Sequence, residues 1–259
     1  MVQKGDYILL EYTVTSKDDG KVVETTVEDT AKQANIYNPD EVYGPRLIIV
    51  GETKLFEPLE QALLATDEGG EVNVEVPPDK AFGERDQGKV KTLSIREFYK
   101  YGKIPKPGDV VEMDGQQARV ISISSGRAIL DFNHPLAGKT LLIKGRIVKK
   151  LVTDEEKAKQ IVKIYLPRVE GGDVEVSVDK AAKSVTVKLP PSTLFIDKIG
   201  NVKLRIAEDL AEKFGAEKVQ FIEEITIKRE EQKEEGGGQP QQEQAQAQQQ
   251  EGGVQSAQA

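Results

Sequence analysis

The chain has 259 residues, a length typical of about two domains, and it contains no cysteine, which excludes disulfides, thiolate catalysis and cysteine-based zinc sites. Its net charge of −8 is uneven: the six Glu and one Lys of residues 230–259 contribute −5 and leave −3 for the rest, so bulk charge does not indicate a nucleic-acid binder. No run approaches the ~18 apolar residues of a membrane span, and the N-terminus lacks an apolar signal core, so we expect a cytoplasmic protein with no nucleic-acid and no membrane partner.

The first 76 residues predict a hairpin, an excursion and a strand–helix–strand unit. The predicted elements are a strand at 6–14, a turn at 16–21, a strand at 22–26, an excursion with one short helix at 28–46, a strand at 47–50, an amphipathic helix at 55–64 and a strand at 71–76. Val72, Val74 and Val76 alternate with polar residues, which indicates that the last strand is half-buried.

After Pro77-Pro78-Asp79-Lys80-Ala81-Phe82-Gly83 the pattern starts again, which indicates a small unit inserted into a larger one. The predicted elements are an extended segment at 90–93, a short helix at 94–101 capped by Ser94 with Glu97, strands at 110–113, 117–123 and 127–131, and hairpin turns at 114–115 and 125–126. The motif DFNHPLAGK at 131–139 then leads into a strand at 140–151. We therefore expect an insert that spans residues 86–130.

The remainder predicts a C-terminal domain and a tail. The predicted elements are a helix at 153–166, alternating strands at 174–178 and 185–189, a helix at 202–214 and a last strand at 219–227. This α-β-β-α-β order has its own set of apolar residues. Residues 230–259 are Gln, Gly, Glu and Ala with almost no large apolar side chain, so they are expected to be disordered.

Rotation about a prolyl amide is a reaction that these residue types allow. The partial double bond gives a barrier near 20 kcal/mol, and uncatalysed isomerisation takes on the order of tens of seconds to minutes. The transition state is a twisted amide with reduced charge separation, so a dry, aromatic-walled pocket favours it over the planar ground state. A ~1000-fold acceleration needs only about 4 kcal/mol. No nucleophile, metal or cofactor is required.

Several motifs occur in order: Leu10-Glu11-Tyr12-Thr13, Ala81-Phe82-Gly83 and residues 133–139. Together they resemble the SlyD-like, insert-in-flap FKBP-type peptidyl-prolyl cis-trans isomerases of the long archaeal type, over about residues 1–150. The resemblance implies an α+β fold, in which an FKBP half-barrel antiparallel sheet wraps on a short helix, a small β-rich domain is inserted in the flap, and a C-terminal α-β-β-α-β domain follows. The implied domains are an isomerase domain at 1–85 plus 131–151, an inserted chaperone domain at 86–130, a C-terminal domain at 152–229 and a tail at 230–259.

The resemblance also implies a site. Its catalytic residues would be Tyr12, Glu24 and Phe82, and its substrate-binding residues would be Val23, Ile48, Leu55, Phe56, Leu59, Leu136 and Ile143. The family usually has an aromatic residue and Asp where this chain has Val23 and Glu24. This difference puts in doubt the usual hydrogen bond between the tyrosine hydroxyl and the acid, and it predicts a looser pocket wall. Phe82 keeps the ring of the family's Ala-Tyr-Gly motif without its hydroxyl, which predicts weaker binding of macrolide-type inhibitors more than slower turnover.

By the same resemblance, the insert is a chaperone module that captures unfolded chains on an exposed apolar groove. Its candidate surface residues are Phe98, Tyr99, Tyr101 and Ile104, although about half of the insert's apolar residues must form its own core. Unfolded or proline-containing polypeptides are the implied partners, and a homodimer through the C-terminal domain is a further candidate. A Gln-rich tail replaces the family's His-rich one, so no nickel, other metal or cofactor is expected. The absence of cysteine, the 2 Met and 31% charged residues are typical of a thermophilic protein.

Each of these residues alone also has an ordinary structural interpretation. Tyr12 and Phe82 fit core packing, the single histidine, His134, fits a structural turn residue, and Glu24 fits a solvated strand position. Their joint occurrence favours the isomerase. Two alternatives stay open: a chaperone or binding module whose pocket has decayed, and an assembly or ribosome-associated scaffold built on the C-terminal domain.

Overall fold

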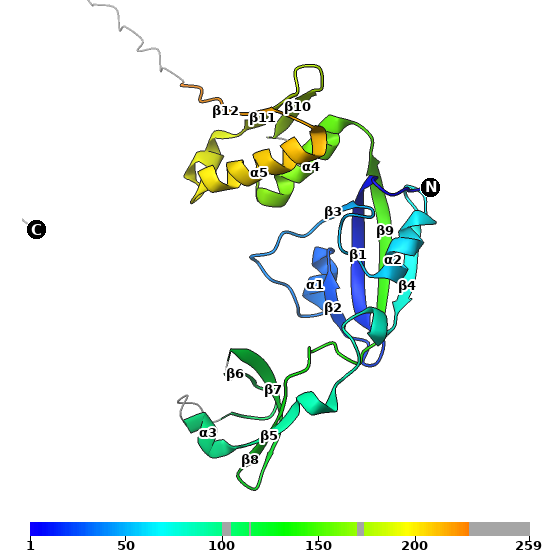
Figure 1. The fold of residues 1–259 in the computed structure, drawn as a ribbon, viewed down its shortest axis with the longest axis vertical. Coiled ribbons are helices and arrows are strands. Elements are labelled where there is room, and N and C mark those ends of the chain that lie inside the picture. The colour runs from blue at the N-terminus through cyan, green and yellow to red at the C-terminus, as the bar shows by residue number, and fades with distance from the viewer. Residues whose placement is uncertain (100–104, 114, 170–173, 228–259) are drawn as a thin grey trace, which may run out of the picture. The chain divides into compact units, whose positions relative to one another are not determined.

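The computed structural model describes residues 1–99, 105–113, 115–169 and 174–227 (Figure 1). By their contacts, residues 1–224 form one compact unit. Tyr101, Ile104, the predicted turn at 114 and the predicted tail at 230–259 lie outside the described residues. The described residues form an α+β fold with three separate sheets, as predicted.

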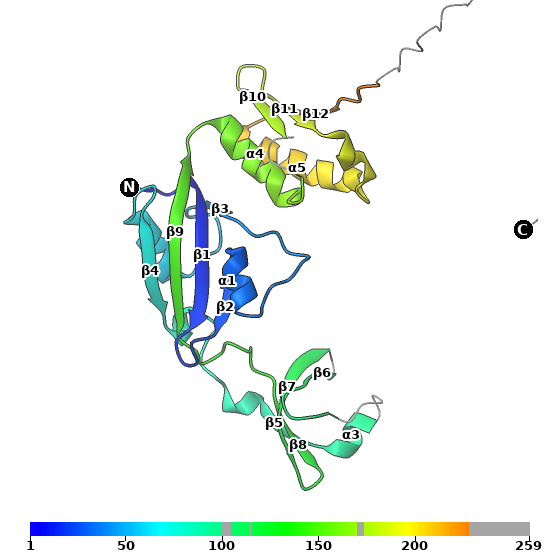
Figure 2. The same cartoon turned by 180° about the vertical axis from the view of Figure 1, so that it is seen from behind.

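The first sheet has five antiparallel strands, β1 (Tyr7–Ser16), β2 (Val22–Thr25), β3 (Arg46–Ile49), β4 (Glu71–Val76) and β9 (Leu141–Leu151). Its order is β2-β1-β9-β4, and β3 pairs with the first half of β1 while β2 pairs with the second half. β1 and β9 run side by side along their length (Figures 1 and 2). The N-terminal strand therefore pairs with a strand that comes after the predicted insert.

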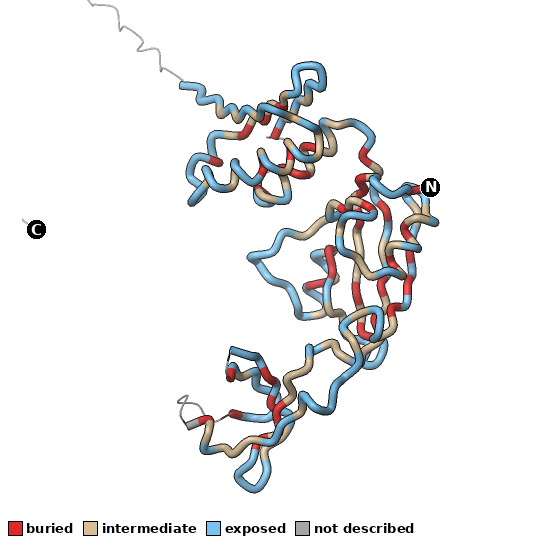
Figure 3. Tube along the Cα trace, viewed as in Figure 1, coloured by how far each residue is buried: buried red, intermediate tan, exposed pale blue. Residues whose placement is uncertain are grey.

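One face of this sheet carries the first hydrophobic core. Alternation places Val72, Val74 and Val76 of β4 inside and the intervening polar residues outside. Helix α2 (Glu57–Leu64) packs on β4 and buries Leu59 and Leu63. Helix α1 (Glu28–Gln33) is the one short helix predicted in the excursion. Figure 3 shows the buried residues in red along the strands of this sheet.

The second sheet lies within residues 90–131. Its strands, in the order β5-β8-β7-β6, are β5 (Val90–Ser94), β8 (Arg127–Asp131), β7 (Gln116–Ser124) and β6 (Val110–Met113), and all pair antiparallel. The turn between β7 and β8 has positive φ at both Ser125 and Gly126, which is the conformation that a tight two-residue hairpin needs. Helix α3 (Ile95–Tyr99) contributes Phe98 to a core shared with Val120 and Leu130. This sheet therefore has its own core.

The third sheet belongs to the C-terminal α-β-β-α-β segment. Its elements are α4 (Asp154–Tyr165), β10 (Glu175–Asp179), β11 (Ser184–Leu189), the 3₁₀ helix η4 (Pro191–Phe195), α5 (Ile199–Phe214) and β12 (Lys218–Glu223). β11 and β12 are parallel, so α5 is the crossover between them. Thr153 and Glu156 form a capping box at the start of α4. A second core joins these helices and strands and also includes Tyr7 and Leu151 of the first sheet.

Two sequence-based expectations are wrong. The sequence predicts that the last strand reaches Ile227, but the strand ends at Glu223, because its partner β11 ends at Leu189, opposite Glu223. Phe98 was expected on an exposed chaperone surface, but it is 3% exposed because its ring fills the core of the second sheet.

Candidate active site

A cavity of about 410 Å³ opens on the first core. Its apolar lining comes from three strands, one helix and the segments beside them, and consists of Leu10, Val14, Ile48, Leu55, Phe56, Leu59, Ala81 and Ile143. Tyr12, Glu24, Lys54, Glu57 and Lys80 complete the wall. The volume lies in the range of small-ligand pockets, and so does the mostly apolar lining. The site can therefore hold a side chain the size of a prolyl ring in a water-poor environment.

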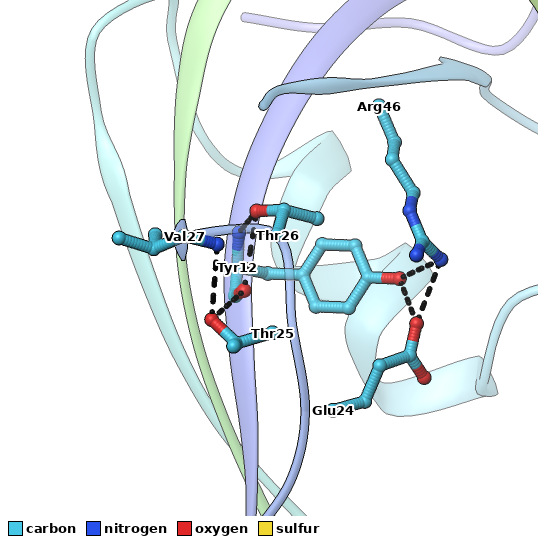
Figure 4. A network of polar contacts seen from close by, with 6 residues as sticks. All are labelled: Tyr12, Glu24, Thr25, Thr26, Val27 and Arg46. Atoms are coloured by element: carbon cyan, nitrogen blue, oxygen red, sulfur yellow. Dashed lines mark hydrogen bonds and ion pairs between the residues drawn. The ribbon is translucent and has the colours of Figure 1, made fainter. Parts of the chain in front are cut away.

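Tyr12, Glu24 and Arg46 form a polar network (Figure 4), of which Tyr12 and Glu24 line the cavity. The Tyr12 hydroxyl donates to Glu24 Oε1 at 2.6 Å, and Arg46 NH1 donates to the same carboxylate oxygen at 2.8 Å. Arg46 NH1 also donates to the Tyr12 hydroxyl oxygen at 3.1 Å. The hydrogen bond between Tyr12 and Glu24, which the sequence puts in doubt, is therefore present, and the hydroxyl proton of Tyr12 points at Glu24.

The network changes the ionisation of the tyrosine. Burial, together with the hydrogen bond to Glu24 and its negative charge, raises the pKa of Tyr12 to about 12, while Arg46 acts in the opposite direction. The guanidinium carbon of Arg46 also lies 5.9 Å from the centre of the Tyr12 ring, within cation–π range. The hydroxyl is thus neutral at any physiological pH, and the ring is fixed from two sides.

The backbone of Tyr12 is held as firmly as its side chain. Its N–H donates to Thr26 Oγ1 at 2.9 Å, and its carbonyl accepts from the Thr25 hydroxyl at 3.2 Å (Figure 4). On the other side β9 supplies Gly145, directly opposite Tyr12. A Cβ at that position would lie 2.9 Å from the Glu11 carbonyl oxygen and 3.1 Å from Tyr12 Cβ. Only a glycine lets β9 approach Tyr12 this closely.

Phe82 lies beside the cavity and is held by other rings. Its ring centroid is 5.7 Å from that of Phe56, at 74°, and 4.2 Å from that of His134, at 5°. Phe82 is 38% exposed and is not among the residues that line the cavity. It therefore extends the aromatic surface outward from Phe56.

The structure brings together most of the site residues that the sequence indicated. The cavity is lined by Tyr12, Glu24, Ile48, Leu55, Phe56, Leu59 and Ile143. Val23 packs against the first core outside the lining, and Leu136, like Phe82, is not part of it. The residue that sequence reasoning missed is Arg46. A cation at the start of the apolar run 46–50 is the one available signal, and it does not say which side chains the guanidinium meets.

Comparisons with known proteins agree with this geometry. Residues 1–111 match the family described as FKBP-type peptidyl-prolyl cis-trans isomerase, residues 91–136 match the FKBP26 IF domain, and residues 154–226 match the FKBP26 C-terminal domain. The chain is 36% identical over 141 residues to a short-type peptidyl-prolyl cis-trans isomerase of Methanocaldococcus jannaschii, covering 54% of this chain and 88% of that protein. It is 34% identical over 145 residues to the FKBP-type 16 kDa isomerase of Escherichia coli, covering 54% of this chain and 87% of that protein. It is 33% identical over 144 residues to SlyD of Aeromonas hydrophila, covering 54% of this chain and 60% of that protein.

This chain belongs to the FKBP-type peptidyl-prolyl cis-trans isomerases. Within that family it is SlyD-like, because it carries the IF domain as an insert. Enzymes of this family act on proline-containing polypeptides. Every helix in the described ranges is too short or too polar to cross a lipid bilayer.

Proposed function

We propose that the cavity beside Tyr12 is where this chain isomerises prolyl peptide bonds. The observation that carries the proposal is the combination of an apolar floor at Leu59 with the Tyr12–Glu24–Arg46 network at one edge. The reaction needs only a surface that accepts the twisted amide better than the planar one. An apolar floor disfavours the more polar planar ground state. The Tyr12–Glu24–Arg46 network places polar groups in fixed positions at the edge of that floor.

Tyr12 acts here as a fixed wall. Its hydroxyl proton is engaged by Glu24 at 2.6 Å, so the ring cannot turn away from the cavity without breaking a charge-assisted hydrogen bond. Glu24 replaces the shorter acid that is usual in the family, and its carboxylate, one methylene further from the backbone, still accepts the hydrogen bond of the hydroxyl. We therefore assign to Glu24 and Arg46 the role of holding Tyr12.

A proline-limited refolding assay tests the isomerase site. The full chain should accelerate the slow phase of a client that must isomerise a prolyl bond, and Tyr12→Ala should lose most of that acceleration. A second client whose refolding has no proline-limited phase serves as the control and should be unaffected. No acceleration at micromolar protein would reject catalysis, and full activity in Tyr12→Ala would reject this cavity as its site.

We also propose that the inserted domain, residues 91–136, holds unfolded chains. It has a core of its own, and yet Val110 and Ile121 remain 66% and 42% exposed on its strands. Exposed apolar side chains of this kind fit binding to the apolar segments of a client. This function is second to isomerisation because the support comes from two side chains and not from a closed cavity.

Aggregation of a thermally unfolded client tests the inserted domain. Replacing residues 87–132 by a short Gly-Ser linker should abolish suppression of aggregation, while Tyr12→Ala should suppress it as well as the unchanged chain does. The linker is short because Asp86 and Asn133 already contact each other through two hydrogen bonds of 2.9 and 2.8 Å. Suppression that survives the replacement would exclude the insert as the holding site.

We also propose a cytoplasmic location, and cell fractionation is the test.

A further proposal is a homodimer formed through the C-terminal domain. Phe195 is 90% exposed and is flanked by Leu194 at 45% and Ile196 at 37%. Burying such a phenylalanine stabilises an interface by roughly 1.5–3 kcal/mol. Light scattering should give twice the mass of one chain for the unchanged protein and the mass of a single chain for Phe195→Ser. The control Val148→Ser, which removes an exposed side chain from β9, should keep the doubled mass. A single chain mass for the unchanged protein would reject the dimer.

A further inference from the structure

Phe82 is an aromatic residue without a polar anchor. A tyrosine at this position could be oriented by its hydroxyl, but phenylalanine has no polar atom. The residue is 38% exposed, so part of its surface faces solvent. Packing against neighbouring groups, without a polar contact, must therefore fix its orientation at the edge of the cavity.

Two rings supply that packing from different directions. Phe56, which lines the cavity, meets Phe82 at a steep angle of 74° with centroids 5.7 Å apart. His134 lies nearly parallel to Phe82, at 5° and 4.2 Å. The steep contact with Phe56 is the edge-to-face arrangement that aromatic pairs favour, and the nearly parallel His134 ring covers a face of Phe82. Phe82 thus has one neighbour on the cavity side and another, His134, from a distant part of the sequence.

His134 is itself held by its own turn. Its Nδ1 accepts the backbone N–H of Leu136 at 3.2 Å, and its carbonyl accepts the N–H of Ala137 at 2.9 Å. The bond at Nδ1 assigns the proton of the neutral imidazole to Nε2. The turn is tied to the segment that carries Phe82 by a hydrogen bond from the Gly138 N–H to the Gly83 carbonyl, at 2.8 Å. The imidazole plane is therefore fixed relative to the backbone next to Phe82.

We propose that His134 is a positioning residue of the isomerase pocket, which stacks on Phe82 and keeps that ring against Phe56 where the polypeptide substrate enters. The inference rests on the proposed assignment of the cavity as the catalytic site. It gives a function to the chain's one histidine that requires neither proton transfer nor metal binding. The useful property of His134 is its flat ring, so another flat ring should replace it.

The stack can be observed directly by proton NMR of the full chain. Because His134 is the only histidine, its two imidazole carbon-bound protons are assigned without ambiguity. The Phe82 ring at 4.2 Å should shift these signals upfield, and Phe82→Leu should return them to ordinary histidine positions. Signals at the same positions in both proteins would show that the stack does not exist in solution and would overturn the proposal.

Activity is tested with two variants that differ only in the ring. His134→Leu and His134→Phe both remove the Nδ1 acceptor, but only phenylalanine can stack. With a proline-containing peptide substrate, His134→Leu should raise KM about three- to tenfold with kcat nearly unchanged, since an aromatic pair is lost at a binding surface. His134→Phe should restore KM to within about twofold of the unchanged chain. Glu84→Gln, an exposed change two residues after Phe82, is the matched control and should have no effect.

The outcomes separate this inference from the assignment on which it rests. An unchanged KM in His134→Leu, or a KM equally raised in His134→Phe, overturns the positioning role because the ring would then be irrelevant. Normal activity in both Tyr12→Ala and Phe82→Leu removes the catalytic site from this cavity, and the inference falls with it. A loss in those two variants together with wild-type behaviour of His134→Leu rejects the inference alone.

Discussion

Tyr12 lines the cavity and Phe82 lies beside it, and the two aromatic side chains are held in different ways. Tyr12 has hydrogen bonds to its backbone and its hydroxyl, and an arginine lies over its ring. Phe82 packs against the rings of Phe56 and His134, with centroids at 5.7 and 4.2 Å. The difference teaches that polar contacts hold the ring that lines the cavity, whereas ring packing without a polar contact holds the ring beside it. Changes on the Tyr12 side should therefore be more costly than changes on the Phe82 side.

The largest effect is expected where β9 passes Tyr12. Gly145→Ala places a Cβ 2.9 Å from the Glu11 carbonyl oxygen and should lower the free energy of unfolding by about 1–3 kcal/mol. Gly200→Ala is the control, because nothing lies within 4 Å of a Cβ there and alanine favours the helix α5 by roughly 0.5–1 kcal/mol. Urea unfolding measures both. Equal stability of the two variants would contradict the close approach at Gly145.

Next in size is the removal of the Tyr12 hydroxyl. Tyr12→Phe keeps the ring and leaves Glu24 paired with Arg46 at 2.8 Å, but it breaks the bond that fixes the ring. Since hydrogen bonds to charged groups contribute about 1.5–3 kcal/mol and this one is partly exposed, kcat/KM should fall about tenfold. The refolding assay measures it. If activity stays at the level of the unchanged chain, the polar network has no part in holding the wall.

A smaller effect is expected from adding a hydroxyl at the outer edge. Phe82→Tyr restores the residue that is usual in the family and leaves the ring between Phe56 and His134. One extra neutral hydrogen bond should strengthen binding of a macrolide-type inhibitor by about 0.5–1.5 kcal/mol, while turnover changes less than about twofold. Calorimetry and the peptide assay provide the two measurements. A gain in turnover larger than the gain in inhibitor affinity would reverse the expected roles.

The smallest effect is spectroscopic. With the pKa of Tyr12 at about 12, Tyr12 should ionise late in an absorbance titration, and the late step, to which Tyr7 and Tyr165 with their raised pKa values also contribute, should be smaller in Tyr12→Phe. Glu24→Gln should lower this pKa and Arg46→Gln should raise it, because the two partners act in opposite directions.

Protein stability should follow the same titration. Folding favours the neutral phenol, so this contribution is complete below pH ~10 and is lost as the pH rises toward 12. The unchanged chain should therefore lose more stability than Tyr12→Phe between these pH values. Parallel stability curves for the two proteins would rule out a raised pKa.

Most elements could be predicted from the sequence because their apolar residues alternate or repeat. The strand at residues 71–76 follows from three alternating valines, and the α-β-β-α-β order follows from similar patterns. Periodicity does not predict where a strand ends when that end depends on the length of the neighbouring strand. The alternation through Ile225 and Ile227 predicts a longer β12, but β11 ends before Pro190-Pro191 and offers no backbone to pair with.

The site could be predicted in its apolar part and not in its polar part. Leu59 and Phe56 follow from motifs that stay local in the sequence. The contact of Arg46 with Tyr12 depends on the register of β3 with β1. This register places Arg46 opposite Leu10, which lies two residues before Tyr12 on the same face of the sheet. The stack of Phe82 on His134 likewise depends on how the chain returns after the inserted domain. Neither pairing has a signal in a single sequence.

The pairing of β1 with β9 has a consequence for how the protein is made. Tyr12 lies on the first strand and Ile143 on the last strand of the sheet, so the cavity cannot close before the ribosome has released residues beyond 143. Residues 90–131 emerge earlier and pair among themselves, from Val90 with Asp131 inward. Since domains fold in the order of synthesis, the inserted sheet is complete while the enzyme around it is still open. During synthesis the cavity is therefore completed after the inserted sheet has formed.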